Sequence, residues 1–112
     1  MNKESLTAKL LDLAEGRETP ETWQNWWDEH ETELEALLSR GEFLKLKPCR
    51  HGFQWVPVFG SQKGAIAILE KSGLAFEASN LYQERYLAEL DAFCKEQERM
   101  QREKQKEFKA SH

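Results

Sequence analysis

Residues 19–38 read TPETWQNWWDEHETELEALL, and this stretch decides the fold class of the 112-residue chain. Thr19 is a favourable N-cap, and Pro20 suits the first helical position because its missing N–H would be unpaired there anyway. Apolar side chains then recur at three- and four-residue spacing, which is the period of a helix with one buried face. The sequence therefore predicts an amphipathic helix of about five turns that ends before Gly41.

The apolar face of this predicted helix is rich in aromatic residues. It consists of Trp23, Trp26, Trp27, His30, Leu34, Leu37 and Leu38. Indoles bury a large apolar area, so most of this face is expected to lie in the core. Tryptophan is also enriched among the residues that anchor protein interfaces, so an exposed indole at Trp26 is a candidate contact for a partner.

The other faces of the same helix carry six carboxylates and no lysine or arginine. Net charge is −7 in residues 1–38, +3 in residues 39–77 and zero in residues 78–112, in agreement with the total of −4. An acidic face attracts a basic partner, although the same residues can serve only as a solvated surface. We predict a surface that binds a basic protein. Its residues are Trp26, Asp28, Glu29, Glu31, Glu33 and Glu35.

The segments on either side of this helix differ in period. Residues 5–15 place leucines on one helical face and end at Gly16, which predicts a short first helix. Residues 42–47 alternate apolar and charged side chains, which is typical of a half-buried strand. Residues 53–59 form a second strand pattern, at an edge or interrupted because Pro57 has no N–H to donate. Together the last two segments predict a β-hairpin around the turn at residues 48–52.

Two further helices are expected in the second half of the chain. Ser61 can cap a helix over residues 63–71, and a short strand is an option at residues 74–77. From residue 81 onward an apolar stripe consists of Tyr82, Tyr86, Leu90 and Phe93, and it fades after Cys94. We therefore predict one globular domain over residues 1–94 and a charged helical extension, free to fray, over residues 95–112.

The predicted fold class is α+β and dominated by helix. About four helices pack on a small antiparallel hairpin, and a long charged helix ends the chain. The expected core residues are Leu10, Leu13, Trp23, Trp27, Leu34, Leu38, Leu44, Leu46, Trp55, Ile66, Leu69, Phe76, Tyr86, Leu90 and Phe93.

The basic residues of the middle segment suggest an alternative function. Lys45, Lys47, Arg50 and Lys63 lie near aromatic residues, and such a combination can bind single-stranded nucleic acid through phosphate contacts and stacking. Lysines also protect an edge strand from pairing with other chains. Four charges make a small electrostatic footprint, so nucleic-acid binding is the alternative to protein binding.

The sequence contains no recognisable catalytic, cofactor or metal motif. Cys49 and His51 supply two of the four ligands that a structural zinc site needs. Residues 60–64 lie before a predicted helix but do not match a phosphate-binding loop. Nothing around Cys49 matches a protease motif. We therefore predict a protein that is not an enzyme and that needs neither a cofactor nor a metal.

The chain lacks a secretory signal and a long apolar segment, so we expect a cytoplasmic protein with two reduced cysteines. Combined with its size and charge asymmetry, this predicts a small non-enzymatic binding protein. Its most concrete form is an immunity or inhibitor protein that neutralises a basic toxin through the acidic helix. A third hypothesis is an oligomeric protein that pairs through residues 79–110, although a heptad pattern is missing after Phe93.

Overall fold

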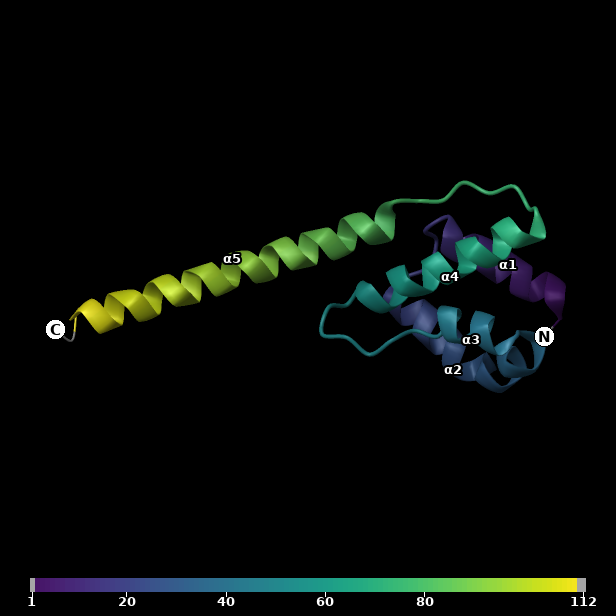
Figure 1. Cartoon of the computed structure of the whole chain (residues 1–112), viewed down its shortest axis with the longest axis horizontal. Coiled ribbons are helices and arrows are strands. Elements are labelled where there is room, and N and C mark those ends of the chain that lie inside the picture. Colours follow the sequence, from purple (N-terminus) through teal and green to yellow (C-terminus); the bar gives the residue numbers. More distant parts are fainter. Residues whose placement is uncertain (1, 111–112) are drawn as a thin grey trace.

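The computed structural model describes residues 2–110 of the chain, with side chains for residues 2–102. Within that range the chain forms five α-helices and no β-strand (Figure 1). The prediction of an α+β fold with a hairpin is therefore wrong, and the described chain is all-helical. The helices are α1 (Lys3–Ala14), α2 (Pro20–Leu37), α3 (Arg40–Leu46), α4 (Val56–Ser72) and α5 (Leu81–Ala110).

The first two helices begin and end close to where their sequence signals place them. The Asn2 side chain accepts a hydrogen bond from the Ser5 N–H at 2.8 Å and caps α1. At the start of α2, the hydroxyl oxygens of Thr19 and Thr22 each accept a bond from the other residue's N–H. Trp23 and Trp27 are buried, so the strongest periodic pattern in the sequence is confirmed.

The first predicted strand, residues 42–47, lies in α3 and the turn that follows it. Ser39 Oγ accepts from the Glu42 N–H at 3.2 Å, and the Glu42 carboxylate accepts from the Ser39 N–H at 3.1 Å. This capping box starts a helix, in which Phe43 and Leu46 share one face. Leu46 is buried, whereas Leu44 is 58% exposed. The alternation of apolar and charged residues over 42–47 therefore belongs to the short helix α3 and the residue after it.

The second predicted strand, residues 53–59, is divided between a loop and the start of α4. Pro57 lies in the first turn of α4, where its missing N–H removes no helical hydrogen bond. The helix continues to Ser72 and closes at Gly73, which adopts the left-handed conformation at φ 74°. Residues 74–79 contain no strand, so the optional third strand is also absent.

Helix α4 is the centre of the fold, because it contacts each of the other four helices. Small side chains allow α3 to approach it closely. A Cβ atom on Gly64 would lie 2.5 Å from the Lys45 carbonyl oxygen. The Ser61 hydroxyl donates to the Leu46 carbonyl at 2.6 Å. The buried Gln62 side chain donates to the carbonyls of Ala14 and Ser79, and so joins the end of α1 to the segment before α5.

The predicted core is mostly confirmed. Seven of its members are buried, which are Leu10, Leu13, Trp23, Trp27, Leu34, Leu46 and Leu69. Six others are partly buried, which are Leu38, Trp55, Ile66, Phe76, Tyr86 and Leu90. The exceptions are Leu44 and Phe93, which is 49% exposed. A strand period would turn Leu44 inward, but the helical period of α3 turns it outward, and Phe93 lies where α5 leaves the body of the protein.

Helix α5 is attached to the other helices near its start and then projects away from them (Figure 1). Tyr82 is fully buried, and its hydroxyl accepts a hydrogen bond from the Glu18 N–H at 2.8 Å. Residues 91–102 are all exposed, and the molecule measures 68 × 28 × 21 Å. The charged extension at residues 95–110 is helical and continuous with residues 81–94, and residues 111–112 lie outside the described residues. None of the helices in residues 2–110 has the length and hydropathy needed to cross a membrane.

Candidate interaction surface

The two charged segments that the sequence suggested as rival sites meet at one edge of the fold. Helix α3 follows α2 after a short turn and folds back along it, so that later residues of α3 lie beside earlier residues of α2. The rings of Trp27 and Phe43 pack with centroids 5.1 Å apart. Glu31 Oε1 lies 3.7 Å from Lys47 Nζ, which joins a predicted acidic residue to a predicted basic one.

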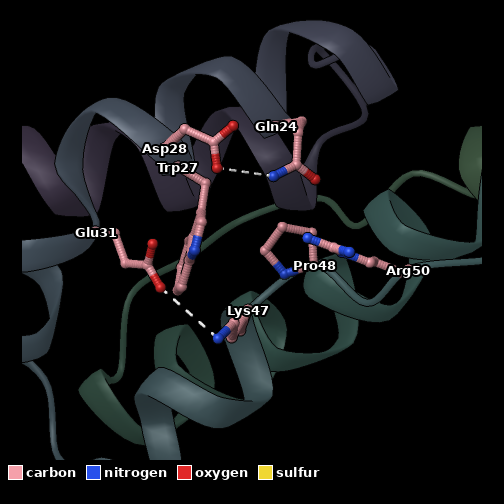
Figure 2. A pocket seen from close by; sticks show the side chains of 7 residues that line it. All are labelled: Gln24, Trp27, Asp28, Glu31, Lys47, Pro48 and Arg50. Carbon is pink, nitrogen blue, oxygen red and sulfur yellow. Dashed lines mark hydrogen bonds and ion pairs between the residues drawn. The ribbon is translucent and has the colours of Figure 1, made fainter.

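A polar hollow of about 420 Å³ opens between α2 and the segment after α3 (Figure 2). Asp28 and Glu31 lie on its α2 side, and Lys47 and Arg50 lie on the opposite side. The Gln24 amide donates to Asp28 Oδ1 at 3.0 Å. The hollow therefore has one acidic wall and one basic wall. Its lining residues are Gln24, Trp27, Asp28, Glu31, Lys47, Pro48 and Arg50.

A second hollow of about 330 Å³ lies along the same two helices and is lined by Glu35, Arg40, Phe43 and Leu44. It again combines an acid from α2 with a base from α3. Neither Arg40 nor Leu44 was predicted as a site residue. Arg40, Leu44 and Lys47 are spaced at i, i+4 and i+7, which places them on one face of a helix. The strand interpretation of residues 42–47 hides this shared face.

The six predicted partner-binding residues lie on two sides of α2. Successive residues turn by about 100° around a helix. Asp28, Glu31 and Glu35 therefore share the edge that faces α3. Trp26, Glu29 and Glu33 form a second row on the other side of the helix, and this set is called the outer row below.

Trp26 is partly buried, because aromatic neighbours cover much of its ring. Its centroid lies 5.3 Å from that of Trp23 and 4.9 Å from that of His30. Lys9 Nζ lies 5.4 Å from the Trp26 centroid and forms an ion pair with the buried Glu18. Trp26 is thus the apolar member of the outer row, and part of its ring packs against neighbours on α1 and α2.

The four residues of the predicted nucleic-acid site lie on α3, on the segment that follows it and on α4. Lys47 and Arg50 face the acids of α2. Lys63 lies on α4, with Nζ 4.5 Å from the Phe59 ring centroid. Lys45 is exposed on α3. Two of the four bases are therefore partly offset by nearby carboxylates, which weakens the attraction of this region for phosphate.

The carboxyl end of α2 is electrostatically unfavourable. Its last turn contains Glu35 and no basic residue. The exposed carbonyl groups at the end of a helix carry partial negative charge, so a carboxylate there is destabilising by about 0.3–1 kcal/mol. Glu42, at the start of α3, is placed favourably, and its hydrogen bond from the Ser39 backbone lowers the pKa of its carboxyl group.

Among the described residues, no group of three or more His, Cys, Asp or Glu side chains is placed to hold a metal ion. Cys49 and Cys94 are both exposed and unbonded. Comparison with protein-family models, curated proteins and solved structures finds no significant match for this chain. The function must therefore be argued from the surfaces of this molecule.

Proposed function

We propose that this protein is a non-enzymatic, cytoplasmic binding protein that recognises a basic protein surface through the outer row of α2. Its most concrete form is an immunity or inhibitor protein that neutralises a basic toxin. The exposed, unbonded Cys49 and Cys94 are consistent with a reducing compartment.

The observation that carries this proposal is the charge of α2. The helix has six carboxylates over Pro20–Leu37 and no lysine or arginine, and it ends in the acidic turn described above. Lys9, the lysine of α1 that lies near Trp26, already pairs with Glu18. Natural sequences tend to break local stability rules at functional sites. A cationic partner surface would offset the repulsion that the isolated helix retains.

The outer row is better suited to a basic partner than the edge that faces α3. Lys47 and Arg50 stand opposite Asp28 and Glu31 and would repel a second set of cations. No ion pair involves Glu29 among the described residues, and the partly exposed Trp26 adds an apolar contact beside it. Protein interfaces commonly combine an aromatic anchor with charges of this kind.

The test uses the full chain as bait in a lysate of its source organism. A captured protein is identified, purified and titrated against the wild-type chain and against E29K/E33K. We expect the double variant to bind at least about tenfold more weakly, because close interfacial charge pairs contribute more than 1.4 kcal/mol.

The matched control is E84K/E98K, which makes the same change in net charge on exposed positions of α5. It should bind the captured protein as the wild type does. If both double variants lose affinity equally, the partner responds to net charge alone and the outer row is not the binding site. An affinity that does not fall with added salt would also contradict an electrostatic interface.

A further inference from the structure

The edge between α2 and α3 carries two facing rows of opposite charge. The acidic row is Asp28, Glu31 and Glu35, at positions i, i+3 and i+7 of α2. The basic row is Arg40, Lys47 and Arg50, on α3 and the segment after it. Because the two segments run in opposite directions, Glu35 and Arg40 share one hollow, whereas Glu31 and Lys47 share the other with Asp28 and Arg50.

The two rows do not neutralise each other fully within one molecule. Glu31 and Lys47 are 3.7 Å apart and form an ion pair across the edge. In the described part of the chain, no ion pair involves Glu35, Arg40 or Arg50, and Asp28 is bonded only to the amide of Gln24. Most of the charges on this edge can therefore pair with groups outside the molecule.

An exposed apolar side chain, Leu44, lies on the basic side of this edge. Leu44 is 58% exposed, the highest value among the large apolar side chains in the described residues. It borders the hollow of about 330 Å³ lined also by Glu35, Arg40 and Phe43. Leu44 therefore offers a second copy an apolar contact within this charged edge.

We propose that this edge binds a second copy of the chain in a two-fold symmetric dimer. A two-fold axis that lies in the interface and runs along the edge sets the acidic row of each copy opposite the basic row of the other. An axis across the edge would set acid against acid. The same surface therefore serves both partners, as a symmetric dimer requires.

The dimer is expected to be weak and sensitive to salt. Its contacts are polar and are centred on a single leucine, and small polar interfaces of this kind bind with dissociation constants of roughly 10–100 μM. At about 0.5 M salt, screening should reduce the association about tenfold or more. The proposal does not depend on the outer row, because Glu29 and Glu33 lie on the other side of α2.

Sedimentation velocity of the full chain, over concentrations from tenfold below to tenfold above this range, tests the dimer at low and high salt. E31K/E35K leaves both rows with a net positive charge, and R40E/K47E leaves both rows with a net negative charge. Each variant alone should be monomeric. An equimolar mixture of the two should form a heterodimer, since every facing pair is then attractive, and E84K/E98K should dimerise as the wild type does.

Circular dichroism tests whether each variant is folded, and the mixture provides a second check because unfolded chains would not form a defined heterodimer. The proposal is overturned if the wild type stays monomeric at low salt or if the mixture does not associate. It is also overturned if both single-row variants remain dimeric, which would assign the contact to another surface such as α5. None of these outcomes depends on whether a basic protein binds Glu29 and Glu33.

Discussion

Replacing Glu89 with alanine should destabilise the fold by about 2–3 kcal/mol, because its carboxylate from α5 caps the start of α4. Trp55 is the N-cap residue of α4, and its own side chain makes no capping hydrogen bond. The N–H groups of Gln54 and Trp55 instead donate to the two oxygens of Glu89, each at 2.7 Å. One side chain therefore pairs the two N–H groups at the entry to α4 and links α5 to that end of the helix.

The expected loss of stability depends on how far water can replace the two hydrogen bonds that Glu89 accepts. Loss of a helix cap costs about 1 kcal/mol, and a hydrogen bond to a charged group contributes about 1.5–3 kcal/mol where water cannot replace it. Gln54 is exposed, so its N–H can bond to water after the change. Trp55 is partly buried, so its N–H accounts for most of the expected loss.

Urea denaturation followed by tryptophan fluorescence measures the free energy of unfolding. Glu89→Gln keeps an oxygen acceptor but removes the charge, so about half of the loss is expected. Glu98→Ala is the matched control, since Glu98 is exposed on the same helix, and its effect should stay within about 0.5 kcal/mol. The reasoning is refuted if Glu89→Ala destabilises the protein no more than Glu98→Ala does.

Two further predictions concern the core. Gly64→Ala should destabilise the fold by about 1–3 kcal/mol, because the new methyl group must displace the Lys45 carbonyl and with it α3; an unchanged urea midpoint would show that α3 does not pack as closely as described. Burial raises the pKa of Tyr82 to about 12, above its ordinary value of 10, so the folded state retains a proton that the unfolded state loses. The corresponding stability is complete below pH 10 and falls by about 2–3 kcal/mol as pH rises to 12. Tyr82→Phe should remove this dependence on pH, and a slope that persists in the variant would assign it to other groups.

The first two helices could be predicted because their signals are local and agree with one another. In α2, the cap at Thr19, the proline after it and a long apolar period all favour the same structure. Residues 42–47 are too short for period alone to separate a strand from a helix. The capping box of Ser39 and Glu42 was present in the sequence and would have decided for the helix.

Residues 53–59 depended on a partner that is distant in the chain. The start of α4 is stabilised by Glu89, which lies 34 residues after Trp55. No local pattern shows that a carboxylate on a later helix will supply this cap. The same applies to Phe93, whose place in an apolar stripe indicated burial, although α5 extends beyond the surface that could cover it.

For the candidate surfaces, too, the charges of each segment could be predicted from the sequence, but their positions relative to one another could not. The sequence alone determined that one helix carries six acids and that the segment after it is basic, because both follow from composition and period. Only the tertiary structure decided that α3 folds back along α2, which sets Lys47 opposite Glu31 and separates Glu29 and Glu33 from that edge. Helical period determines the direction of a side chain within its own helix, whereas the charge that it faces depends on which helices the core brings together.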